Sequence, residues 1–250
     1  MINMALGVAL ETGTTCLWYG RILELIGTHA RSSSRDDILM ILDRELIYHL
    51  EWLGQHGETP LSYKDTTLVI TEEMNEISQL GESGGEVALF NYDVKPVSKQ
   101  LLDYCLRLMS YNRSDLLSEI RDLKNDTLTY TPPMKSRNIN QILHHFCNAE
   151  EFYVSRLGSK ADQIYEYNLG MRVNEADKLP VIERLSVVRR GCVETLKQVV
   201  PGKKDQVFTR SEYTNYPDEK WTAHKVLRRF LEHEREHIYN IREYLGLPLR

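Results

Sequence analysis

The sequence predicts an α+β protein in which a small N-terminal α/β module precedes a C-terminal four-helix bundle. Residues 1–90 mix short β-branched runs with one amphipathic helical pattern. Residues 91–250 carry four long helical patterns instead. A glycine-rich stretch at residues 81–85 lies near this change and is the expected linker. We therefore expect two domains, 1–90 and 91–250.

Composition indicates an ordinary soluble protein, with 42% hydrophobic and 27% charged residues in a chain of 250. The net charge is -5 and the basic residues alternate with acidic ones, so we expect no nucleic-acid partner. No apolar run is long enough to cross a bilayer, and the apolar N-terminus lacks a basic leader. The four cysteines form no CxxC pair and are interpreted as free thiols. These features favour a cytoplasmic protein without a membrane partner.

The N-terminal module is expected to begin with a β-hairpin. Runs 5–11 and 14–19 are rich in β-branched and aromatic residues, and Thr12 and Gly13 form a turn-like pair between them.

An amphipathic helix should follow over residues 38–53, with Ser34 as its N-cap. Gly54 and Gly57 should end this helix, and a further strand is expected within residues 65–77.

The order strand–strand–helix–strand, with the surroundings of Trp18 and Trp52, resembles the small α/β modules of the HicB antitoxin type. The resemblance implies a module for dimerisation or binding, and a homodimer is one expectation. A simple accessory domain is the alternative.

Four long helices are expected in the C-terminal domain, over residues 96–123, 136–157, 180–200 and 222–245. Prolines lie at the start of the first and third helices, Thr222 is the expected N-cap of the fourth, and Gly246 follows it. Residues 158–177 are interpreted as a long connection. Helices of this length favour a bundle, in which sites are built from side chains on facing helices.

The fourth helix carries the motif HEREH at residues 233–237. Its core stripe has spacings of three and four residues and contains Val226, Phe230, His233, His237, Ile241 and Tyr244. Two imidazoles four residues apart lie on one face of a helix, about one turn apart. This is the spacing that a divalent transition metal requires of a helical ligand pair.

The second helix offers two adjacent histidines, and only one of them can face the core. His144 shares its face with a polar row (Asn148, Glu151 and Ser155). His145 lies on the apolar side, with Ile142, Ala149 and Phe152. We therefore predict His145 as the third ligand and expect His144 to face solvent. A lone inward histidine is more often a satisfied core residue, but three converging histidines favour a metal site with an open position.

The same motif also matches H-E-x-x-H, in which Glu234 would be the general base of a zinc hydrolase. Thirteen residues follow His237, which leaves little room for the usual downstream third ligand. Glu234 and Glu236 flank the core stripe, so we expect Glu234 to face outward and pair with nearby bases. This hydrolase stays a minor alternative.

Two segments together resemble the DinB-like (damage-inducible) superfamily of metal-binding four-helix-bundle proteins. They are INQILHHFCNAE at 139–150 and KWTAHKVLRRFLEHEREH at 220–237, followed by IREYL at 241–245. The resemblance covers residues of about 91–250. The family motif on the second helix falls on His145 and Glu150, and its HxxxH pair falls on His233 and His237.

The chain departs from the family pattern at one position. Many members carry a further histidine one turn before the pair, where this chain has Arg229. Arg229 either holds an anionic substrate group or caps the core stripe at the surface, and we favour the second.

The resemblance implies a divalent ion (zinc, nickel, iron or manganese) and a superfamily that includes thiol-dependent transferases and isomerases. In these, the metal is thought to bind a low-molecular-weight thiol such as bacillithiol or mycothiol. The leading hypothesis is therefore a metal-dependent transferase or hydrolase acting on a small molecule. The alternative is a non-enzymatic, stress-associated binding protein whose metal site is structural or vacant. Glu150, Tyr153 and Tyr239 are candidates to support the ligands.

Overall fold

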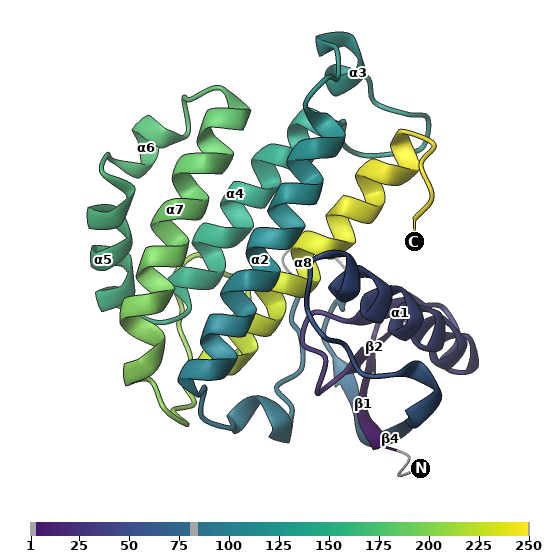
Figure 1. Cartoon of the computed structure of the whole chain (residues 1–250). Helices are drawn as coiled ribbons and strands as arrows, with labels where there is room; N and C mark the ends of the chain where they lie inside the picture. Colours follow the sequence, from purple (N-terminus) through teal and green to yellow (C-terminus); the bar gives the residue numbers. More distant parts are fainter. Residues whose placement is uncertain (1–3, 81–84, 250) are drawn as a thin grey trace. The chain divides into compact units, whose positions relative to one another are not determined.

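The computed structural model describes residues 4–80 and 85–249, and the chain divides into two compact units. The first unit contains the residues up to 95 together with 207–220, and the second contains 96–206 and 221–249. Strands occur in the first unit and long helices dominate the second, which confirms the mixed α+β class (Figure 1). The predicted linker at 81–85 lies outside the described residues apart from Gly85, and the domain boundary at 90 stays a prediction.

The first unit is built on a four-stranded sheet of order β3-β2-β1-β4. Strand β1 pairs antiparallel with β2 and parallel with β4, and β2 pairs antiparallel with β3. Its elements are β1 (Met4–Gly13), β2 (Trp18–Ile22), β3 (His29–Ser32), α1 (Arg35–Gln55), the 3-10 turn η1 (Tyr63–Asp65), β4 (Thr66–Ile77) and the 3-10 turn η2 (Asn91–Val94).

The predicted hairpin is present, but its second strand begins at Trp18 rather than at residue 14. The chain turns between the strands, where Cys16 has a positive φ of 57° and its N–H donates to the Gly13 carbonyl. Strand β3 was not predicted, because its four residues are too few to show an alternation.

Helix α1 packs on one face of the sheet through a stripe of buried residues that includes Ile38, Leu42 and Leu46. The helix can approach closely because Gly20 of β2 lacks a side chain: a Cβ there would lie 2.6 Å from Leu42 Cδ1. Ser34 caps the helix as predicted, and its hydroxyl accepts the Asp37 N–H.

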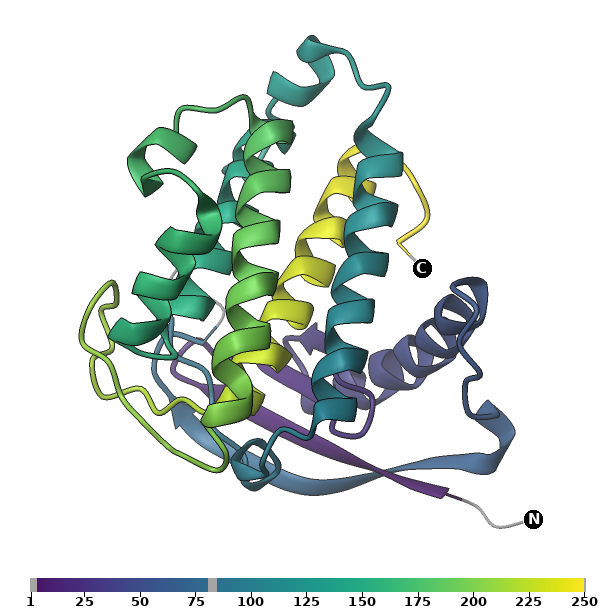
Figure 2. The same cartoon turned by 60° about the vertical axis from the view of Figure 1, so that its left-hand side comes forward.

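Four long helices of the second unit correspond to the four predicted ones, and they run side by side (Figure 2). Helix α4 packs against α7 and α8, and α2 packs against α8. The elements are α2 (Lys99–Ile120), α3 (Asn125–Thr129), α4 (Ile139–Ser155), α5 (Ser159–Leu169), α6 (Val173–Ala176), α7 (Val181–Val199), the 3-10 turn η3 (Val200–Gly202) and α8 (Ala223–Tyr244).

The long connection predicted at 158–177 is wrong, because it contains α5 and α6. Ala161, Tyr165 and Leu169 are buried at a spacing of four, which is a helical pattern, and α5 packs along α7.

Side-chain caps decide where the helices begin. Thr222 accepts the Lys225 N–H at 3.0 Å and so caps α8 as predicted. Asn138 and Gln141 form a capping box, so α4 begins at residue 139 rather than at 136. Ser98 caps α2, which moves its start from residue 96 to Lys99.

The cysteines are free thiols, as expected, with Cys16 exposed and the other three buried. Burial raises the pKa of Cys105 and of Cys147 to about 12, so both keep their protons near neutral pH. Across residues 4–80 and 85–249, no helix combines the length and the apolar character needed to cross a membrane.

Candidate metal centre

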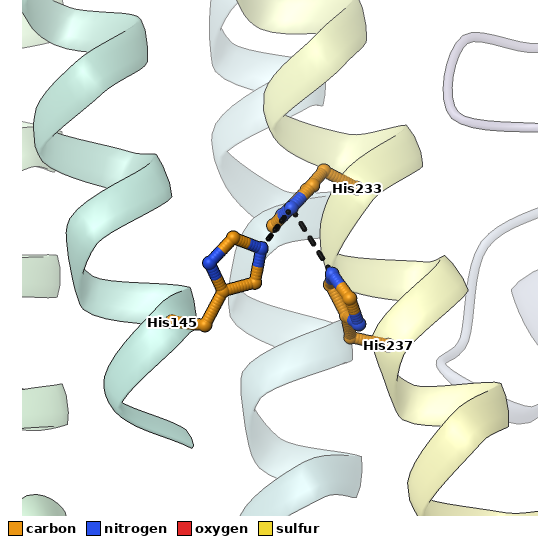
Figure 3. A group of neighbouring side chains, drawn as sticks. All are labelled: His145, His233 and His237. Carbon is orange, nitrogen blue, oxygen red and sulfur yellow. Dashed lines mark hydrogen bonds between the residues drawn. The ribbon is translucent and has the colours of Figure 1, made fainter. Parts of the chain in front are cut away.

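Three histidines from two helices point toward one another in the second unit (Figure 3). Nε2 of His233 lies 3.0 Å from Nε2 of His145 on α4 and 3.1 Å from Nε2 of His237 on its own helix. The candidate ligand atoms all lie within 4.8 Å of one another. The structure thus brings together the three residues predicted from helix phase, and they are the one such cluster among the described residues.

The spacing of the ring nitrogens fits a shared cation. Two nitrogens bound tetrahedrally at metal–nitrogen distances of about 2.0–2.1 Å are separated by about 3.3 Å. The separations of 3.0 and 3.1 Å are close to this value. Small rotamer shifts would therefore be enough to place all three nitrogens around one ion.

Burial and mutual repulsion keep the imidazoles of His145 and His233 neutral. Burial lowers the pKa of His145 to about 4, with further lowering by His237 and Arg137. Burial also lowers the pKa of His233 well below its usual value, as do the two neighbouring imidazoles. Near pH 7 both rings are in the neutral form that binds a metal.

Aromatic rings and one amide surround the cluster. The ring of Tyr153 meets His233 edge-on at 5.7 Å, and that of Phe146 meets His237 at 5.8 Å. The side-chain amide of Asn240 lies 3.1 Å from Nδ1 of His237, the nitrogen that points away from the other two histidines. When His237 binds a metal through Nε2, its Nδ1 carries the proton, and the Asn240 amide turned by 180° would accept that proton through Oδ1 and fix the ring orientation.

Of the three predicted supporting residues, Glu150 pairs with Arg113 and Arg189. Tyr153 packs against the cluster as a candidate should, while the role of Tyr239 stays a prediction. Asn240 was missed, although its position three residues after His237 on the same helix is a usable signal.

Glu234 does not face outward as predicted: only 2% of it is exposed, and it belongs to a buried ion network with Glu150. Arg189 Nη2 lies 2.5 Å from Glu234 Oε1 and 2.6 Å from Glu150 Oε1. Arg113 Nε donates to Glu234 Oε1 at 3.2 Å, and Arg113 also pairs with Glu150. The two arginines come from α2 and α7, which a pattern confined to one helix cannot reveal.

Arg229 does not cap the core stripe at the surface, because only 8% of it is exposed. Its guanidinium pairs with Glu232 on the same helix at 2.9 Å. The positive charge of Arg229 is therefore paired with Glu232, one turn further along α8.

His144 is half-buried rather than fully exposed, and it contacts α7. Nη1 of Arg184 from α7 lies 3.4 Å from His144 Nδ1, and Nη2 donates to Asn148 at 2.8 Å and to Glu151 at 3.2 Å. His144, Asn148 and Glu151 on α4 thus face α7, where the buried Arg184 contacts all three. His144 and His145 therefore face different neighbours, and only His145 joins the cluster.

Comparison with known proteins gives a family for this part of the chain. A family model described as the DinB superfamily matches residues 108–241, which is more than half of the chain and includes all three histidines. No curated protein and no solved structure gives a match.

Proposed function

The chain belongs to the DinB superfamily, and from this premise we propose that it is a divalent-metal-dependent enzyme acting on a small molecule. We propose His145, His233 and His237 as the ligands, with α2, α4, α7 and α8 forming the four-helix bundle that carries them. The observation that supports this most directly is the convergence of three ring nitrogens within 4.8 Å.

The donor set suits a borderline transition metal. Neutral imidazole nitrogens favour zinc, nickel or iron, and they accept manganese less readily. Three protein ligands leave at least one further coordination position, as in catalytic sites. A divalent ion held there would lower the pKa of a water molecule or a thiol in that position.

The nucleophile is best supplied from outside the chain. Cys147 and Cys192 are buried on α4 and α7, and burial raises the pKa of each thiol, so neither supplies a thiolate. Glu150 and Glu234 are each bound to two guanidiniums. A water molecule or a low-molecular-weight thiol therefore fits the nucleophile's role, which gives a hydrolase or a thiol-dependent transferase.

The surrounding side chains would hold the site in shape. Tyr153 and Phe146 form an aromatic wall against His233 and His237, which limits the access of water from that side. The Asn240 amide would orient His237 through Nδ1.

Two alternatives are less well supported. The zinc-hydrolase reading requires Glu234 beside the metal-bound water, but its carboxylate contacts Arg113 and Arg189. A structural metal site is typically closed by four protein ligands, whereas this cluster offers three, and two of them, His145 and His233, are only half-buried. The dimeric state, the cytoplasmic location, the absence of a nucleic-acid partner and the HicB-like role of the first unit stay predictions.

The test first measures metal binding and then asks whether the bound metal has a free coordination position. Purified protein is stripped with a chelator, titrated with Co²⁺ and followed by its visible absorption. We expect one Co²⁺ per chain and loss of binding in His145→Ala and His237→Ala. His144→Ala should retain Co²⁺, because the ring of His144 contacts Arg184 of α7.

A small thiol is then added to the Co²⁺ protein. A new sulfur-to-cobalt charge-transfer band is expected if the position is open. If the spectrum of the Co²⁺ protein changes with neither a thiol nor another small ligand, the non-enzymatic alternative is favoured. If the chain binds no Co²⁺, the proposal is refuted.

A further inference from the structure

A buried ion network joins all four long helices of the second unit. Arg113 of α2, Glu150 of α4, Arg189 of α7 and Glu234 of α8 each contribute one side chain, and their exposed fractions lie between 2% and 9%. Each guanidinium contacts both carboxylates. Two positive and two negative charges balance, so the group is electrically neutral.

The two acidic members stand on the helices that carry the histidines. Glu234 directly follows His233 on α8, and Glu150 lies five residues after His145 on α4, about 7.5 Å along the helix axis. Like charges repel, so the carboxylates by themselves would push α4 and α8 apart. Because each guanidinium attracts both carboxylates, the two arginines link α4 to α8.

The two basic members are anchored by the backbone. Arg113 Nη1 donates to the Leu185 carbonyl of α7 at 2.9 Å, and Arg189 Nη1 donates to the Met109 carbonyl of α2 at 3.0 Å. Both guanidiniums are therefore tethered by the backbone as well as by the carboxylates. A rigid planar guanidinium that is tethered in this way fixes distances that a flexible ammonium group could not.

Stability alone is a weak reason for such a group. Buried ion pairs are often no more stabilising than well-packed apolar residues of similar volume, because of the cost of desolvating the charges. Metal binding, in contrast, tolerates errors in ligand distance of only about 0.2 Å. Apolar contacts are non-directional, so they fix the separation of α4 and α8 less precisely than guanidinium–carboxylate pairs do.

We propose that the network of Arg113, Glu150, Arg189 and Glu234 sets the separation of α4 and α8 at which His145 can share a metal ion with His233 and His237. These four are positioning residues, and the inference rests on the proposed metal site. Arg189 is the best residue to test, because it touches both carboxylates and lies on a helix that carries no ligand.

The experiment compares Arg189→Met with the matched control Arg184→Met. Both residues are buried arginines of α7, but the acidic partners of Arg184 are Glu151 of α4 and Asp177, so its loss leaves the link to α8 intact. Co²⁺ affinity is measured on protein that is shown to be folded by its helical circular dichroism. We expect Co²⁺ to bind about 10- to 100-fold more weakly to Arg189→Met and within about twofold of wild type to Arg184→Met.

If Arg189→Met does not fold, Arg189→Lys is used in its place. It keeps the positive charge but not the planar bridge, and should also bind Co²⁺ at least about tenfold more weakly. Wild-type affinity in a folded Arg189 variant would overturn the inference and leave the metal site standing. An equal loss in Arg184→Met would also overturn it, because any loosening of α7 would then explain the result. Failure of the wild type to bind Co²⁺ would instead refute the proposed function.

Discussion

Without its metal, the three-histidine cluster should make the protein sensitive to acid. Burial lowers the pKa of His145 from 6.5 to about 4 in the folded chain. Below pH 6.5 the unfolded chain therefore binds a proton that the folded chain rejects. The contribution of His145 to stability is complete above pH 6.5 and is lost progressively as the pH falls from 6.5 toward 4.

The size of this effect follows from the two pKa values. Between about pH 7 and pH 5, a shift from 6.5 to about 4 corresponds to a loss of at most about 2 kcal/mol of unfolding free energy. Solvent reaches the half-buried ring and screens its charge, which reduces the expected loss to about 1 kcal/mol. His233, whose pKa is lowered in the same direction, adds to the loss over the same range.

The assay is urea unfolding of the chelator-treated protein, followed by circular dichroism near pH 7 and near pH 5. His145→Phe keeps an aromatic ring but cannot bind a proton. We expect the variant to lose about 1 kcal/mol less stability than wild type between the two conditions. An identical loss in both proteins would show that His145 does not titrate as its burial requires.

Three further predictions address the first unit, a helix cap and the support of a ligand. Gly13→Ala should destabilise the first unit by about 3 kcal/mol or more, because a Cβ there would lie 1.7 Å from the Ile77 carbonyl oxygen; an unchanged urea midpoint would refute this. Thr222→Ala should cost the second unit about 1 kcal/mol and Thr222→Ser should restore it, with equal midpoints for all three proteins counting against the cap. Asn240→Leu should weaken Co²⁺ binding about 10- to 100-fold through loss of the contact with His237 Nδ1, and an unchanged titration would remove Asn240 from the site.

Helix phase was the feature of the candidate site that the sequence predicted best. Two histidines four residues apart in an apolar stripe must share a face, whatever the rest of the fold does. The same reasoning separated His145 from His144, and the structure places only His145 in the cluster. Capping residues such as Ser34 and Thr222 were predictable for a similar reason, because a cap depends on a few neighbouring residues.

The ion network was not predictable from a single helix pattern. A charged residue is expected at the surface by default, so Glu234 was placed there. Its partners Arg113 and Arg189 lie 121 and 45 residues away in the sequence, on two other helices. Both arginines do occupy core-facing positions of their helices, next to buried residues such as Met109 and Leu185. An arginine in an apolar stripe is therefore the signal that could have indicated a buried acidic partner.

The account depends on one ion bound by three ring nitrogens, and X-ray absorption spectroscopy of the zinc-loaded protein tests this most directly. The spectrum should show three imidazole nitrogens at about 2.0–2.1 Å and at least one further light-atom ligand, which exchanges for sulfur at about 2.3 Å when a small thiol is added. In His145→Ala, which should not retain the ion, the zinc–imidazole signal should be lost. A zinc ion with fewer than three imidazole ligands in the wild type, or a spectrum that His145→Ala leaves unchanged, would contradict the account.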